Sequence, residues 1–95
     1  MTKDMFATIL ARAECKTRDD GGADLPEGKT LTLYLSRDGT SLQVSRVVEM
    51  KLDSGIVEAA THKGEMFLVA LDDLFAASVS GGSKSTKARK AGFLG

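Results

Sequence analysis

Two adjacent carboxylates, Asp72 and Asp73, interrupt the most apolar stretch of the chain, EMFLVALDDLFAASVS at residues 65–80. Paired carboxylates can serve as general acid and base or hold a metal ion. A tight turn is the competing explanation, because Asp is favoured where a helical turn begins. Neighbouring residues of a strand point to opposite faces, which separates two carboxylates instead of pairing them. We therefore expect Asp72 to cap a single turn, DDLF, and Asp73 to be a solvated neighbour.

Two further side chains could be reactive, and both have a structural explanation. His62 is the only histidine and stands beside Lys63-Gly64 in an expected hairpin turn, which favours a solvated imidazole over a catalytic one. Cys15 lies near Lys16 and Arg18, and nearby cations can lower the pKa of a thiol. We prefer a half-buried structural thiol at the end of a helix. A single cysteine excludes an internal disulfide and a Cys-rich zinc site.

Known catalytic and binding motifs are absent from the sequence. It has no G-x-S-x-G elbow, no dinucleotide fingerprint and no phosphate-binding loop, and GGSKST resembles such a loop in composition alone. The segment DDGGAD, residues 19–24, has three carboxylates without the alternating oxygen ligands of a calcium loop, so we expect it to be solvated. The sequence therefore predicts no enzyme, no cofactor and no metal site.

The elements that would position these residues are mostly strands. Leucines alternate with polar residues over residues 30–36, which indicates a half-buried strand, and Asp38-Gly39 favours a two-residue hairpin turn. A second strand follows, in which one face over eleven residues is apolar apart from Arg46. A bulge near Arg46 or Val47 would explain this charge and the adjacent valines. The apolar residues assigned to that face are Leu42, Val44, Val48, Met50 and Leu52.

The chain then turns at residues 53–55, pairs back over residues 56–61 and turns again at residues 62–64 into EMFLVAL. Side chains on both faces of this last strand are apolar, so we expect it to be covered on both faces, either by a helix or by a partner chain. A short final strand containing Phe75, Ala77 and Val79 follows the DDLF turn.

The N-terminal region can be interpreted in two ways. Phe6, Ile9 and Leu10 have helical spacing, and Asp4 stands at the capping position, so we favour an amphipathic helix over residues 4–16. Alternation of side chains over the same residues also permits an extra strand. Residues 17–29, rich in Gly and Asp and containing the only proline, are expected to form a surface loop.

This layout resembles the small barrels of the Sm-like group within the SH3-like class. The stretches LTLYLSRDGTSLQV and FLVALDDLFAASV, about half of the chain, carry the resemblance. It implies a mainly β fold: a five-stranded antiparallel SH3-like (Sm-like) barrel with an N-terminal helix. It also implies assembly into rings. No RNA-binding residue is carried over, because Val44 or Ser45 and the sequence LDSGIV stand where the family has its characteristic glycine and loop.

Length and charge divide the chain into one domain and a tail. Ninety-five residues suit a single small domain, which we place at residues 1–80, with a basic tail at residues 81–95. The tail has four basic side chains and no acid, whereas residues 1–80 contain 9 basic and 13 acidic ones. No stretch approaches the length of a membrane span, and the N-terminus has no secretory signal, so we expect a cytoplasmic protein with no membrane partner.

We expect a non-enzymatic interaction or assembly module that forms a homo-oligomer through the strand at residues 65–71. The predicted interface residues are Met66, Phe67, Val69 and Leu71. The tail could dock on a neighbouring copy or on a protein partner. The alternative is a nucleic-acid-associated protein that uses the same tail, although few aromatic residues are present to stack bases. The tail residues proposed for either role are Lys84, Lys87, Arg89, Lys90, Phe93 and Leu94.

Overall fold

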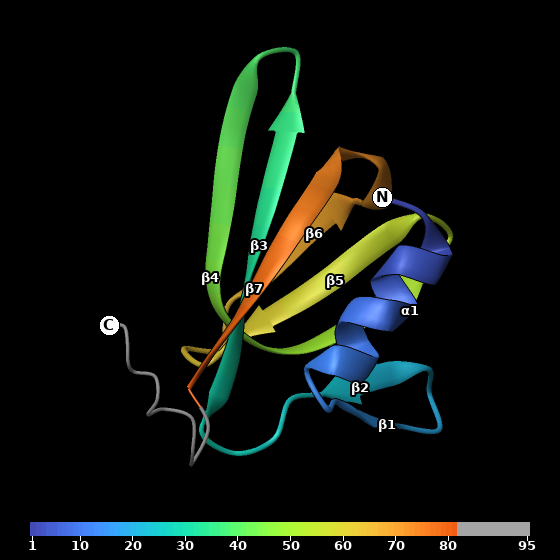
Figure 1. Ribbon diagram of the computed structural model, residues 1–95, viewed down its shortest axis with the longest axis vertical. Helices are drawn as coiled ribbons and strands as arrows, with labels where there is room; N and C mark the ends of the chain where they lie inside the picture. Colours follow the sequence, from blue (N-terminus) through green and yellow to red (C-terminus); the bar gives the residue numbers. More distant parts are fainter. Residues whose placement is uncertain (82–95) are drawn as a thin grey trace.

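A computed structural model of the protein describes residues 1–81. They form a curled antiparallel sheet, a half-barrel, with one helix packed against it (Figure 1). In chain order the elements are α1 (Lys3–Arg12), β1 (Lys16–Thr17), β2 (Gly22–Asp24), β3 (Lys29–Arg37), β4 (Thr40–Asp53), β5 (Ile56–Thr61), β6 (Met66–Ala70), the 3₁₀ turn η1 (Leu71–Asp73) and β7 (Leu74–Gly81).

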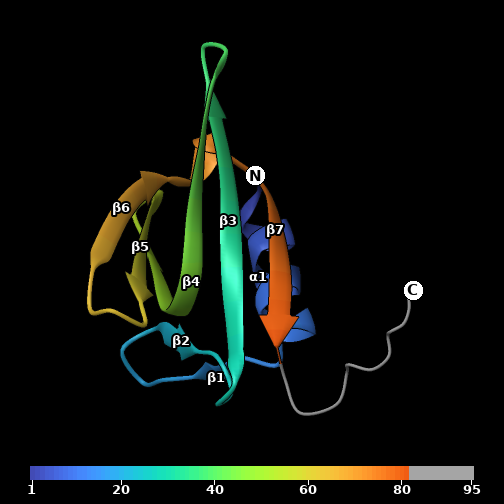
Figure 2. The same ribbon diagram turned by 90° about the vertical axis from the view of Figure 1, so that its left-hand side faces the viewer.

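The central strand of the sheet is β3, which lies between β4 and β7 along most of its length (Figure 2). The first part of β4 pairs with β3, and its last part lies between β2 and β5. β6 continues the sheet beyond β5, and no pairing between β6 and β7 joins the two ends of the curl within residues 1–81. The mainly β, antiparallel architecture is confirmed, but it has seven strands instead of the predicted five.

The two additional strands occupy the segment expected to be a loop, except that β1 begins at Lys16, the last residue of the predicted helix. Within residues 17–29, β2 forms a short hairpin with β1 and also pairs with β4, where Ala23 faces Met50. Gly21, with φ +90°, turns the chain between the two strands. Strands of two and three residues give almost no periodic signal, so composition alone favoured a loop.

The helix is confirmed but is shorter than predicted. α1 ends at Arg12, and residues 13–16 leave it through Glu14, which has φ +62°. Thr2, not Asp4, is the N-cap, because its hydroxyl accepts a hydrogen bond from the backbone N–H of Met5 at 3.0 Å. The amino group of Met1 donates to the carbonyl of Leu71 at 3.1 Å, which ties the start of the chain to η1.

The expected turns and the bulge in β4 are present. Asp38 and Gly39 both have positive φ, as a type I′ hairpin requires, and Ser54-Gly55 forms a second turn of this kind. Arg46 adopts φ +58° in the middle of β4, where the pairing with β3 shifts register. The predicted bulge is therefore confirmed.

The bulge changes which residues of β4 face the core. One extra residue at Arg46 reverses the alternation, so that Val47 faces the core and Val48 is half-buried. A second register shift, between Val47 and Glu49 in the pairing with β5, returns Met50 to the core face. Leu42 is 55% exposed, since it lies on the part of the β3–β4 hairpin that projects beyond the rest of the sheet (Figure 1). The single continuous face predicted from Leu42 onwards was wrong at these two positions.

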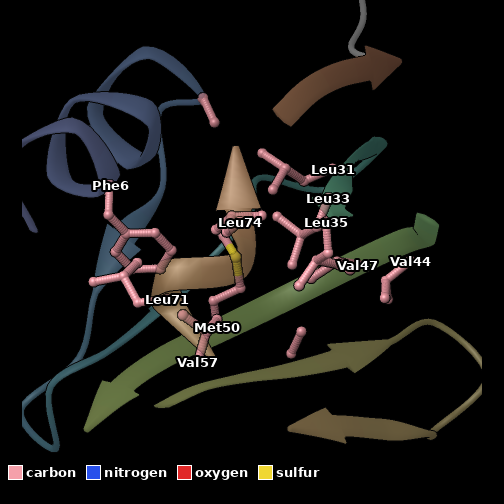
Figure 3. Close-up of a cluster of buried hydrophobic side chains, with 12 residues drawn as sticks. Phe6, Leu31, Leu33, Leu35, Val44, Val47, Met50, Val57, Leu71 and Leu74 are labelled. Atoms are coloured by element: carbon pink, nitrogen blue, oxygen red, sulfur yellow. The ribbon is translucent and has the colours of Figure 1, made fainter. Parts of the chain in front are cut away.

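The core fills the concave side of the sheet beneath α1 and η1 (Figure 3). The three leucines of β3, predicted from alternation, are buried, and Phe6 of α1 lies close to Leu71 in the close-up. The largest fully buried side chains are Leu31, Leu33, Met50, Leu74, Val47 and Val57.

Candidate functional site

The most exposed apolar segment of the described chain is β6. Met66 is 55%, Phe67 37% and Leu68 67% exposed, so both faces of the strand present apolar side chains. β6 pairs with β5 on one side, and within residues 1–81 no strand pairs with its other side. An open edge with apolar side chains is a surface on which another chain can add a strand.

The four predicted interface residues divide into two pairs. Met66 and Phe67 are on the exposed part of β6. Val69 is half-buried against the core, and Leu71 is 5% exposed within it. Leu68, which sequence reasoning omitted, is the most exposed of the group. Because the odd-numbered and the even-numbered residues of EMFLVAL are both mostly apolar, alternation gave no basis for predicting which face of the strand is exposed.

A groove of about 610 Å³ runs between β6 and the projecting β3–β4 hairpin. Leu42 lies on the hairpin side and Leu68 on the β6 side. At its rim the guanidinium of Arg37 pairs with Asp73, with 3.0 Å between Nε and Oδ2. The groove therefore joins the exposed face of β6 to a second exposed leucine.

The structure corrects the roles assigned to the two aspartates. The predicted single turn exists as η1, but its N-cap is Ala70 and no side chain caps it. Asp72 is exposed and has no capping role, whereas Asp73 is the one in an ion pair. The Arg37 partner was not visible in the sequence, because 36 residues separate it from Asp73.

The acidic segment DDGGAD is not simply solvated. Arg18 contacts three carboxylates: Nε lies 3.2 Å from Asp20, Nη1 lies 3.0 Å from Glu49, and Nη1 also pairs with Asp24. The backbone N–H of Gly22 donates to Asp20 at 2.8 Å, and this bond, followed by the one from Arg18, lowers the pKa of Asp20. The cluster fastens the β1–β2 hairpin to β4, which is a structural role.

The two reactive side chains occupy the surroundings that were expected. Cys15 is free and half-buried after α1, and burial, reinforced by the charge of Asp24, raises the pKa of its thiol. His62 is exposed in the turn between β5 and β6. Neither lies beside Asp72 or Asp73 in a common pocket.

The described part of the chain contains neither a metal-binding cluster nor a membrane-spanning helix. Among residues 1–81, no three His, Cys, Asp or Glu side chains form a group that could hold a metal ion. In the same range, no helix has the length and apolar character needed to span a bilayer. The six residues of the tail prediction, from Lys84 to Leu94, lie outside the described residues.

Compared with known proteins, the chain matches no family model, no curated protein and no solved structure.

Proposed function

We propose that the protein is a non-enzymatic assembly module that self-associates through β6. The observation that carries the proposal is the combination of three consecutive exposed apolar side chains, residues 66–68, with an open strand edge. Proteins usually protect such edges with charge, proline or a covering element. β6 has no charged residue and no proline between Met66 and Ala70.

Two kinds of interaction stabilise association at this strand. An added strand pairs with the free N–H and C=O groups of β6, and apolar side chains on both strands lose contact with water. Burying a leucine side chain contributes about 1.5–3 kcal/mol when it is initially fully exposed. Leu68 is 67% exposed, so its burial would contribute about two thirds of this free energy. Burial of Met66 and Phe67 would add to it.

The partner edge determines the kind of assembly. β6 against β6 of a second copy gives a closed dimer, whereas β6 against a different edge gives a ring or a filament. Ring assembly is also what the Sm-like resemblance implies. The solution mass distinguishes these forms.

Leu68→Lys tests the proposal, and Val69→Lys is its matched control. Leu68 points to solvent and Val69 towards the core, although they are neighbours on the same strand. We expect Leu68→Lys to lower the mass measured by light scattering and to leave the domain folded, because lysine is tolerated on an exposed face; its melting temperature should fall only by the stabilisation that association supplied. Val69→Lys should lower the melting temperature, because it places a charge against the core.

Two results would contradict the proposal. One is a wild-type protein that is monomeric at the highest concentration measured. The other is a folded Leu68→Lys variant with the mass of the wild type, which would place any interface elsewhere.

A further inference from the structure

Arg46 occupies an unusual place in β4. Four residues other than glycine have positive φ in residues 1–81, and Arg46 is the one that lies within a strand. Asp38 and Ser54 stand in hairpin turns, where this conformation is common, and Glu14 follows α1. A left-handed conformation has a conformational cost for an arginine that glycine would avoid. Since the side chain is exposed, packing does not explain why arginine stands here.

The bulge brings Arg46 beside the turn between β5 and β6. The backbone N–H of His62 donates to the carbonyl of Arg46 at 3.1 Å, which holds the turn against β4. A pocket of about 420 Å³ lies at this junction. Its lining includes the basic side chains of Arg46 and Lys63, together with the imidazole of His62.

Neutral donors and one acid complete the polar lining. Gln43 and Ser45 precede the bulge, and their side chains lie 3.4 Å apart between Nε2 and Oγ. Glu65 is the one carboxylate among the lining residues. Two cations against one anion leave the pocket with an excess of positive charge, although residues 1–80 as a whole have an excess of acid.

The two cations of the pocket have no protein counter-ion in the described chain. Within residues 1–81, Arg18, Lys29 and Arg37 pair with carboxylates, whereas Arg46 and Lys63 form no ion pair, a property that they share with Lys3, Arg12, Lys16 and Lys51. A guanidinium and an ammonium group that line one pocket without a carboxylate partner are suited to an external oxyanion.

We propose that this pocket binds the phosphate group of a small molecule. Arg46 supplies a planar donor pair, Lys63 supplies a point charge, and Gln43, Ser45 and His62 supply further hydrogen-bond donors. The exposed ring of Phe67 lies on the same pocket and offers an apolar surface to the remainder of the ligand. The volume falls within the range of small-molecule sites. The site does not depend on self-association, because all five of these polar groups lie on β4 and the turn at residues 62–64, outside β6.

Equilibrium dialysis of the full-length chain with radiolabelled inorganic phosphate tests the proposal, with ionic strength held constant by chloride. We expect saturable binding that chloride does not displace. Arg46→Asn and Lys63→Gln should each weaken it about fivefold, which is the effect of one charge at about 4 Å in water. Asn tolerates the left-handed conformation, so the first variant should keep the bulge and the melting temperature.

Two further variants control for general charge effects. Glu65→Gln removes the acid of the pocket and should strengthen phosphate binding. Arg12→Gln removes an exposed cation at the end of α1, away from the pocket, and should leave the affinity unchanged. Adenosine monophosphate distinguishes the ligand class. If it binds more tightly than phosphate, and if Phe67→Ala removes this advantage, the ligand has a planar ring. If the two bind equally, the pocket recognises the phosphate group alone.

Binding that chloride displaces at equal ionic strength would overturn the proposal. So would an Arg12→Gln variant that weakens binding as much as Arg46→Asn does, because the effect would then come from overall charge. A monomeric wild type would contradict the proposed self-association and leave the phosphate site intact, so the two failures can be told apart.

Discussion

The bulge at Arg46 makes a quantitative prediction about two adjacent valines. Without a bulge, Val48 would lie on the same face as Val44 and point to the core. In the structure Val47 is fully buried and Val48 is half-buried. Val47→Ala and Val48→Ala remove the same atoms from neighbouring positions of one strand, so they lose the same intrinsic strand preference. Their difference in stability therefore reports which side chain packs in the core.

The expected difference follows from burial. Removing two methyl groups from a fully buried valine costs about 1.6 kcal/mol in transfer free energy. The cavity left behind adds about 1 kcal/mol if roughly 40 Å³ stays unfilled. We therefore expect Val47→Ala to lower the free energy of unfolding by about 2–3 kcal/mol, and Val48→Ala to lower it by less than about 1 kcal/mol.

Urea unfolding, followed by circular dichroism at one protein concentration, measures both variants. The slope with urea should match that of the wild type, so that the midpoint shift reports stability. If Val48→Ala is the more costly change, or if the two are equal, the assignment of core-facing residues beyond Arg46 is wrong. Arg46→Gly provides a second check, because a glycine should be accepted at φ +58° without unfolding the domain.

Three other results follow from the polar contacts. Gly22→Ala should loosen the β1–β2 hairpin, seen as faster amide exchange there, because a Cβ at Gly22 would collide with the guanidinium of Arg18 and displace it from its carboxylate partners. Asp73→Asn should lower the free energy of unfolding by about 0–1 kcal/mol, because it removes the partly exposed ion pair with Arg37, whereas Asp72→Asn should be neutral. If thermal melts show that Asp72→Asn is the more destabilising variant, Asp72 caps the turn after all. The raised pKa of Cys15 should make its alkylation at neutral pH slower than in urea. It should also make stability fall as pH rises above the ordinary thiol pKa of about 8.5, because the unfolded chain then loses its proton first.

Much of the β architecture could be predicted from local patterns. Strict alternation located β3, and the dipeptides Asp38-Gly39 and Ser54-Gly55 located two turns, because positive φ restricts the residue types there. Adjacent valines and a misplaced charge indicated the bulge. These signals depend on residues close together in the sequence, which is why they could be recognised.

The rest depends on contacts between distant residues. Arg18 is 31 residues from Glu49, and no local pattern marks them as partners. Likewise, the sequence showed that β6 is apolar on both faces but not which side chains the core would cover. That choice follows from the curl of the sheet, which buries Leu71 and leaves Leu68 exposed. The pocket beside Arg46 was missed for the same reason, because it combines a bulge with a turn 16 residues further along the chain.

The position of β3 at the centre of the sheet has a consequence for folding order. Its pairing with β4 is local, joined by a two-residue turn, but its partner residues in β7 are more than 38 residues away, as with Tyr34 and Ala76. Chain closure of this length is slow compared with hairpin formation. During synthesis, one edge of β3 therefore remains unpaired until β7 has left the ribosome. A chain that stops before residue 74 would keep that edge permanently, with Leu31, Leu33 and Leu35 beside it, and we expect such a fragment to aggregate.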